Sequence, residues 1–236
     1  MTPAPKPQPI GALVDTHTAK RPERVTLRGR AITLVPLDAE THAAALFAGA
    51  NGGEKDRVWT YLFDGPYADP DEFKANIAAK ALSADPLFFA ILDNASGAAV
   101  GYQTFLRIEP SHRVIEVGNI LYTPAMQKTI GATEAQYLFA RYVFEELGYR
   151  RYEWKCNDLN APSKRAALRY GFAFEGVFRQ HMIVKGRNRD TAWFAMLDSE
   201  WPRRREAFER WLDPANFDRA GRQKTSLMSL NAEDAK

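Results

Sequence analysis

The stretch that decides the fold runs from Thr133 to Gly176 and reads TEAQYLFARYVFEELGYRRYEWKCNDLNAPSKRAALRYGFAFEG. Its first part has the i, i+3, i+4, i+7, i+8 apolar spacing of an amphipathic helix, carried by Ala135, Leu138, Phe139, Tyr142 and Val143. Thr133, with Gln136 three residues later, fits a capping box, and Gly148 is a typical stop. The pattern predicts a helix that begins at Thr133 and ends before Gly148.

The second part of the stretch predicts a strand and a short helix. Tyr152, Trp154 and Cys156 alternate with charged residues, as in a strand with two unlike faces. Asn160 is a typical N-cap two residues before Pro162, and Gly171 ends the helix. With a strand ahead of it, the stretch reads as a strand–helix–strand crossover, which is right-handed in nearly all sheets.

Strand and helix signals alternate on both sides of this stretch. Upstream we expect strand pieces over 25–35 broken at Gly29, a helix from Asp38 to the Asn51-Gly52-Gly53 turn, a helix over 71–81 opened by Asp69-Pro70, and strands over 87–92, 98–108 and 114–122. Downstream we expect a hairpin of 174–184 and 190–197 and a helix over 199–212. This order predicts an α+β fold with a mixed, mostly antiparallel sheet of about seven strands flanked by helices.

The composition excludes several classes of protein. With 236 residues, 45% hydrophobic and 26% charged, the chain suits one sizeable core and not a disordered or collagen-like protein. A single cysteine, Cys156, cannot form an internal disulfide and indicates a reducing compartment. No apolar run approaches the roughly 18–20 residues of a membrane span, and the N-terminus lacks a signal-peptide core. We expect a cytoplasmic protein without a membrane partner.

Three segments are expected along the chain. Residues 1–23 contain five prolines and read as an extended arm. Residues 24–200 form the domain, and residues 201–236 a C-terminal helix followed by a loose tail. The C-terminal helix is a candidate support for a homodimer.

Positive charge is concentrated in residues 150–189. This window holds ten basic and three acidic side chains, a net charge of +7, whereas the rest of the chain carries −4. Such an excess attracts a phosphorylated ligand or an acidic partner, although a solvated face gives the same pattern. The window lacks the interleaved aromatics of single-strand binders, so nucleic acid is disfavoured as a partner.

Several motifs, taken together, resemble the GNAT superfamily of N-acetyltransferases. Asn160-Ala-Pro-Ser163, Ala166-Ala167, Tyr170-Gly-Phe172 and Glu175-Gly176 resemble the signature N-x-x-S…A…GF…EG of the branch that includes the ribosomal-protein N-terminal acetyltransferases. Ala132-Thr-Glu-Ala135 resembles the start of that branch's central helix, and Glu116-Val-Gly118 its preceding strand. The resemblance covers residues 24–200.

The resemblance implies acetyl-CoA as co-substrate, with its pantetheine arm between two splayed parallel strands and its diphosphate before the helix at Thr133. A helix N-terminus offers unpaired N–H groups to such an anion. The family loop is usually Q/R-x-x-G-x-G/A, whereas this chain has Gln127-Lys-Thr-Ile130-Gly131-Ala132, so we expect an altered cradle. The cofactor residues implied are Ile120, Leu121, Tyr122, Gln127, Lys128, Thr129, Gly131, Ala132, Thr133, Asn157, Asn160 and Arg165; Arg169, one turn after Arg165, is a further candidate for the 3′-phosphate.

Two side chains are candidates for acid–base chemistry. Glu116 is the carboxylate placed to act as base, directly or through water; the alternative is a solvated strand residue paired with an arginine. Many superfamily members use a tyrosine acid where this chain has Ala167, so Ser163 is the candidate that relays a proton to the leaving sulfur. The alternative for Ser163 is a structural role in the first turn of its helix. Main-chain N–H groups around Asn119, Ile120 and Leu121 are the expected oxyanion donors, since the resemblance implies a bulged strand there.

The acceptor end is assigned to an aromatic loop. The family places the loop between the first two helices there, which nominates Trp59, Tyr61, Phe63 and Tyr67, with Asn119 from the strand. A packed minicore is the alternative for the four aromatic side chains. No metal is expected, because His17, His42, His112 and His181 are scattered and Cys156 stands alone.

These residues predict an enzyme that transfers an acetyl group from acetyl-CoA to a primary amine by direct attack in a ternary complex. The acceptor is a protein N-terminus or a small molecule. The alternative is a catalytically weak GNAT-fold module that senses acyl-CoA or binds protein or RNA, which Ile130 and the missing tyrosine at Ala167 favour.

Overall fold

A computed structural model describes residues 8–232, whose sheet has eight strands. Their order is β1-β2-β3-β4-β5-β6-β8-β7, and within the described chain β5 and β6 form the parallel pair while the other neighbours are antiparallel. The strands are β1 (Leu27–Arg28), β2 (Ile32–Pro36), β3 (Leu87–Asp93), β4 (Ala99–Glu109), β5 (Val114–Tyr122), β6 (Arg151–Asn157), β7 (Ala173–Val184) and β8 (Arg187–Leu197). The α+β architecture is confirmed. The sheet has an eighth strand because the first strand segment is interrupted near Gly29, which separates β1 from β2.

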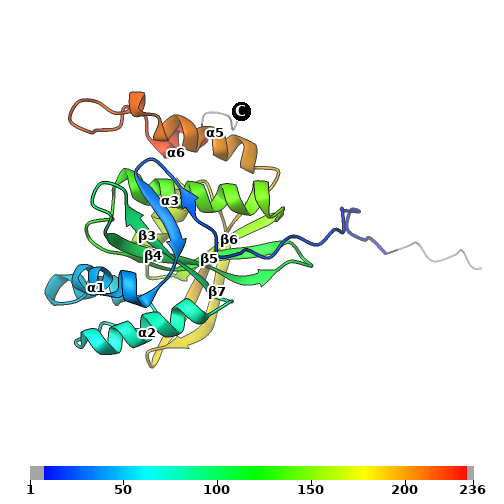
Figure 1. Cartoon of the computed structure of the whole chain (residues 1–236). Helices are drawn as coiled ribbons and strands as arrows, with labels where there is room; N and C mark the ends of the chain where they lie inside the picture. Colours follow the sequence, from blue (N-terminus) through cyan, green and yellow to red (C-terminus); the bar gives the residue numbers. More distant parts are fainter. Residues whose placement is uncertain (1–7, 233–236) are drawn as a thin grey trace, which may run out of the picture.

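Helices cover both faces of the sheet (Figure 1). Two of them, α1 (Ala39–Ala50) and α2 (Pro70–Leu82), lie on one face, and α3 (Ile130–Arg141) lies on the other, continued by a π-helical turn over Tyr142–Glu146. The remaining elements are 3₁₀ turns at Gly53–Trp59 and Pro214–Asn216, α4 (Ala161–Arg169), α5 (Trp201–Leu212) and α6 (Leu227–Ala232). No helix within residues 8–232 is long and apolar enough to cross a membrane.

Most helix ends obey the local signals in the sequence. Asp38, Asp69 and Asn160 are N-caps whose carboxylate or amide oxygens accept from first-turn N–H groups. Gly148 and Gly171 have φ of +76° and +91° after the helices that they end.

The start of α3 was predicted wrongly. The helix begins at Ile130 and is capped by Thr129, whose Oγ1 accepts from the Ala132 N–H at 3.2 Å. Thr133 is therefore inside the helix and buried, and its Oγ1 accepts from the guanidinium of Arg169 on α4 at 2.9 Å. The capping-box spacing matched, but a threonine one turn earlier caps the helix.

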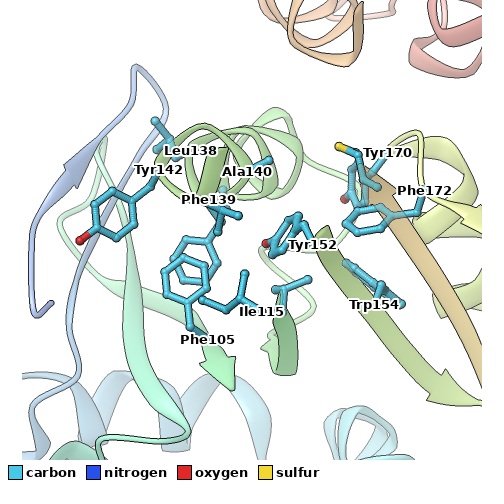
Figure 2. Packing of buried hydrophobic residues seen from close by; sticks show 14 of the residues in the cluster. Phe105, Ile115, Leu138, Phe139, Ala140, Tyr142, Tyr152, Trp154, Tyr170 and Phe172 are labelled. Carbon is cyan, nitrogen blue, oxygen red and sulfur yellow. The ribbon is translucent and has the colours of Figure 1, made fainter. Parts of the chain in front are cut away.

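The main core lies between α3 and the sheet (Figure 2). Phe105 of β4 stacks on Phe139 of α3 with ring centroids 3.9 Å apart, and Trp154 of β6 packs edge-on against Phe172. A second core lies under α1 and α2 and contains Trp59 and Phe73. The side chains of β5 and β6 that point to α3 are thus apolar.

The segments outside 24–200 are described in part. The N–H groups of Ala19 and Lys20 donate to the carbonyls of Pro110 and Leu147, whereas residues 1–7 of the expected arm lie outside the described residues. Towards the C-terminus, α6 buries Leu227 and Leu230 in the main core. Residues 233–236 of the expected tail also lie outside the described residues, and the three-segment division stays a prediction.

Candidate active site

The two parallel strands separate at the centre of the sheet. Their pairing runs from Val114 opposite Arg151 to Val117 opposite Trp154 and stops there. Beyond that point β5 pairs with β4 and β6 pairs with β8. The inner edges of Gly118–Tyr122 and Lys155–Asn157 therefore present main-chain N–H and C=O groups to the gap between them.

A bulge in β5 lies at this gap. Asn119 has φ of +46°, and the register between β4 and β5 shifts between Tyr102 and Thr104. Bulges re-aim the main chain of the strand that carries them. The expected bulge is present, and the assignment of oxyanion donors to Asn119, Ile120 and Leu121 stays a prediction.

The loop before α3 leads into a helix start suited to an anion. The first turn of a helix leaves N–H groups without intrahelical acceptors, and Thr129 satisfies the one at Ala132. Gln127 donates from Nε2 to the carbonyl of Tyr122 at 3.0 Å, which ties the loop to the end of β5. Lys128 is exposed with φ of +62°. A cation and free N–H groups at the start of a 12-residue helix fit a diphosphate.

Gly131 and Tyr122 contribute differently from the expectation. A Cβ on Gly131 would lie 2.6 Å from Cγ2 of Ile32, so this glycine lets α3 approach β2. The neighbouring Ile130 packs against the main core. Tyr122 points its hydroxyl into a buried amide network, donating to Gln103 at 2.7 Å, and its remaining contribution to a ligand is its main chain.

The polar residues after β6 are used within their own turns. Asn157 Oδ1 accepts from the N–H of Leu159 at 2.9 Å, and Asn160 Oδ1 accepts from that of Ser163 at 3.1 Å. Arg165 is exposed, whereas the guanidinium of Arg169 is held between Thr133 and the ring of Trp211, 4.7 Å away. Arg169 therefore joins α4, α3 and α5, and Arg165 is the freer cation on this helix.

Glu116 lies in a buried ionic cluster on the face of the sheet opposite α3. Its Oε2 is 2.8 Å from Nζ of Lys155 and 3.2 Å from Nε of Arg107, and the residue is 5% exposed. Lys155 also pairs with Glu153 at 2.6 Å, and its ammonium lies 3.9 Å from the ring centre of Trp193. Burial raises the pKa of Glu116, against the opposing effects of Lys155 and Arg107. The alternative of a solvated residue is thus wrong, although an arginine is one of its partners.

Ser163 lies on the other side of the strand pair. Its Oγ accepts from Nε1 of Trp154 at 3.0 Å. Trp154 and Ile115 point into the core under α3 (Figure 2), whereas Glu116 and Lys155, their neighbours in sequence, point away from it. Since Trp154 uses an acceptor site of Oγ, the serine O–H is available to donate.

The aromatic loop divides into two pairs. Trp59 is fully buried, donates from Nε1 to the carbonyl of Ala50 at 2.7 Å, and meets the ring of Tyr67 edge-on. Tyr67 in turn donates to Asp64 Oδ2 at 2.9 Å. Trp59 and Tyr67 thus form the packed minicore that was the alternative for this loop.

Tyr61 and Phe63 instead contact residues outside the loop: Tyr61 contacts the turn after β6, and Phe63 contacts β8. The hydroxyl of Tyr61 donates to the carbonyl of Leu159 at 3.1 Å, and Phe63 lies under the guanidinium of Arg189, 5.2 Å from its ring centre. Lys185, in the β7–β8 turn, donates to the carbonyls of Trp59, Asp64 and Gly65. The loop and the hairpin therefore enclose the face that carries Glu116.

Three residues of this face were not nominated from the sequence: Lys155, Arg189 and Trp193. The first two were counted only in the basic window. Arg189, Thr191 and Trp193 alternate with other residues on β8 and so share one face, which is the signal that was available. Their meeting with β5 depends on strand order, which the sequence does not display.

The comparisons with known proteins agree with this geometry. The acetyltransferase (GNAT) domain family matches residues 31–173, more than half of the chain. This chain belongs to the GNAT acetyltransferase family. Members of this family take the acetyl group from acetyl-CoA and act on an amine acceptor.

Solved GNAT structures resemble this chain over most of its length. A GCN5-related N-acetyltransferase from Brucella melitensis is 50% identical, with a TM-score of 0.90 over 92% of this chain and 98% of its own. A GNAT-family protein from Chromobacterium violaceum is 40% identical, with a TM-score of 0.76 over 84% and 100%. A candidate ribosomal-protein-serine acetyltransferase from Vibrio cholerae, at 19% identity and a TM-score of 0.64 over 73% and 97%, shares the fold. None of the curated proteins matches this chain.

Residues 8–232 contain no group of three histidine, cysteine, aspartate or glutamate side chains arranged to hold a metal ion.

Proposed function

We propose that this GNAT enzyme acetylates a primary amine by direct attack in a ternary complex, with Glu116 as base and Ser163 as acid. The observation that carries the proposal is the position of these two side chains on opposite faces of β5 and β6, at the point where the strands separate. Direct transfer needs amine and thioester to meet from two sides, and Glu116 and Ser163 lie on the two sides of this strand pair.

On the α3 side, the chain's own groups would hold acetyl-CoA. The first-turn N–H groups of α3, with Lys128, would bind the diphosphate, and the strand edges of Gly118–Tyr122 would pair with the amides of the pantetheine arm. When bound, acetyl-CoA supplies an activated acyl carbon and a thiolate leaving group. Arg165, exposed on α4, stays the candidate for the 3′-phosphate.

On the opposite face, Glu116 would take a proton from the amine. A carboxyl group with a raised pKa is a stronger base than an ordinary glutamate, and the recorded ion pairs of Glu116 with Lys155 and Arg107 both involve Oε2. N–H groups of the bulge at Asn119 would stabilise the negative charge that develops on the acyl oxygen. As the amine nitrogen bonds to the acyl carbon and the C–S bond breaks, Ser163 would hydrogen-bond the leaving sulfur and relay to it a proton from solvent, because a serine hydroxyl is too weak an acid to give up its own proton to a thiolate.

The acceptor is either a protein N-terminus or a small amine. The ribosomal-protein branch is supported by the signature residues from Asn160 to Gly176. Nucleic acid is disfavoured because much of the basic window is used internally: Arg151 pairs with Glu153 and Glu175, and Lys164 pairs with Asp158.

Thiol release from acetyl-CoA with a panel of primary amines tests this proposal. Glu116→Gln should lower kcat by about 10²–10⁴-fold, the usual contribution of a positioned base, while calorimetric CoA binding is retained. Glu153→Gln is the matched control, because it removes a carboxylate from the same Lys155 without removing the base. Equal losses in the two variants, or turnover unchanged in Glu116→Gln, would remove Glu116 from the chemistry.

A further inference from the structure

Arg189 of β8 is a buried cation without an anion. The residue is 8% exposed, and no hydrogen bond or ion pair joins its guanidinium to another residue of the described chain. Its Nε is fully buried and has no acceptor. The guanidinium lies over the ring of Phe63, 5.2 Å from its centre. A buried guanidinium N–H normally donates to a carboxylate or carbonyl, so Nε of Arg189 lacks an acceptor that a ligand would supply.

The surroundings of Arg189 carry an excess of positive charge. Four cations lie in or beside this cluster, Arg107, Arg151, Lys155 and Arg189, against three carboxylates, Glu116, Glu153 and Glu175, so one positive charge is unmatched. The same excess acts on His181, whose pKa is lowered by burial and by the charges of Arg107, Arg189 and Lys155.

A second buried donor on the same strand also lacks an acceptor. Nε1 of Trp193 has no hydrogen-bond partner, and Trp193 lies four residues after Arg189, on the same face of β8. The buried donor at Arg189 and the surplus positive charge fit a ligand group that brings one negative charge and acceptor atoms, and the donor at Trp193 lies further along the same face.

We propose that Arg189 binds a carboxylate on the amine acceptor, so that the substrates of this enzyme are amines that also carry a carboxylate group. The inference rests on the proposed function, because it takes the amine to bind on the Glu116 face. A carboxylate matches the planar fork of a guanidinium and brings a single charge, equal to the deficit. The diphosphate of the co-substrate is accounted for elsewhere, at the start of α3.

The geometry relates this group to the reaction. Arg189 and Glu116 lie on the same face of the sheet; burial lowers the pKa of Arg189, and the charge of Glu116 opposes that effect. Phe63 and Tyr61 border the same space from the aromatic loop, and the Lys185 contacts hold that loop to the hairpin. An amine anchored through its carboxylate at Arg189 would therefore approach Glu116 in one orientation.

Matched pairs of ligands test the proposal by binding, independently of turnover. The probes are L-leucine, L-methionine and L-phenylalanine with their carboxamides, and Ser-Glu-Ala-Ala against Ser-Gln-Ala-Ala as terminal amides, titrated calorimetrically in the presence of CoA. For at least one pair the acid should bind about 10–100-fold more tightly than the amide, as expected for a charge-assisted bidentate contact. The amino-acid and peptide arms show whether the carboxylate belongs to a free amino acid or to an acidic residue near a peptide N-terminus.

Arg189→Met should abolish this difference while leaving the affinity for CoA unchanged. Arg187→Met is the control, since it removes the same charge from an exposed position of the same strand. Arg189→Met should also unfold at the same or a higher temperature, because it removes an unpaired buried charge.

Acids that bind no better than amides, no binding of any acid, or a preference that survives in Arg189→Met would each overturn the proposal. Thiol release measured with the same probes separates it from the proposed function. If acids bind in an Arg189-dependent way without turnover, the carboxylate proposal stands and the proposed acetyltransfer on this face is contradicted. If turnover occurs without a preference for acids, the proposed function stands and the carboxylate proposal is contradicted.

Discussion

Glu134 is predicted to be one of the most important polar residues for stability. Its carboxylate, on α3 and 6% exposed, accepts three main-chain N–H groups from the turn between β1 and β2. Oε1 accepts from Arg30 at 2.8 Å, and Oε2 accepts from Ala31 at 2.7 Å and Ile32 at 3.0 Å. The carboxylate also explains Gly29, where a Cβ would lie 2.4 Å from Cδ of Glu134.

The size of the effect follows from these three contacts. In Glu134→Ala the N–H of Ile32 stays buried without an acceptor, at about 1–3 kcal/mol, whereas those of Arg30 and Ala31 are partly hydrated and lose about 0.5–1.5 kcal/mol each. We expect a loss of about 2–6 kcal/mol in the free energy of unfolding, or a fall of about 5–20 °C in Tm for a chain of this length.

Urea unfolding at constant pH measures this loss, with Glu40→Ala as control. Glu40 pairs with Lys74 at 2.6 Å on the surface, where water and salt screen the pair, so its loss should change stability little. If Glu134→Ala lost less than about 1 kcal/mol with an unchanged m-value, the turn would not depend on this carboxylate.

Three further predictions concern the site itself. Gly131→Ala should lose about 1–2 kcal/mol of stability, because overpacking of the new Cβ against Cγ2 of Ile32 outweighs the better helix propensity of alanine. Urea unfolding measures this loss, and a variant as stable as the wild type would mean that α3 is free to shift. Ser163→Ala should lower kcat about 10–100-fold with CoA affinity retained, and an unaltered kcat in the thiol assay would end its role as acid. Because burial raises the pKa of Glu116 and the base acts when deprotonated, kcat should fall as pH drops through that raised value, an acidic limb that Glu116→Gln should lack; a limb that persists in Glu116→Gln belongs to another group.

Local signals in the sequence were sufficient for much of the fold. The caps at Asp38, Asp69 and Asn160 were predictable because the capping oxygen and the N–H that it accepts lie within three residues. The start of α3 was not, because Thr129 and Thr133 are both plausible caps and the choice depends on the packing of Gly131 against β2, about a hundred residues away. A contact between residues so far apart in the sequence produces no pattern in the residues around the helix start.

The ionic cluster shows the same limit at the site. Glu116, Lys155 and Trp193 come from three strands, and their meeting depends on the order β5-β6-β8 and on the register that sets Lys155 opposite Trp193. The family resemblance could place Glu116 near the co-substrate, but it could not supply Lys155 as its partner. It also could not separate Trp59, which packs, from Phe63, which faces Arg189.

The unpaired charge of Arg189 helps to explain why the face of the sheet that carries Glu116 is polar. Replacing buried ions by apolar side chains of similar size is often neutral or stabilising, so a purely structural role for this face would be served better by methionine or leucine than by Arg189. A side chain retained at a cost to stability is best explained by a ligand that the free protein lacks. The two readouts of Arg189→Met should therefore move in opposite directions, towards higher stability and lower selectivity for carboxylates. A purely structural role predicts lower stability in Arg189→Met and no carboxylate selectivity that depends on Arg189, and the two measurements together decide between them.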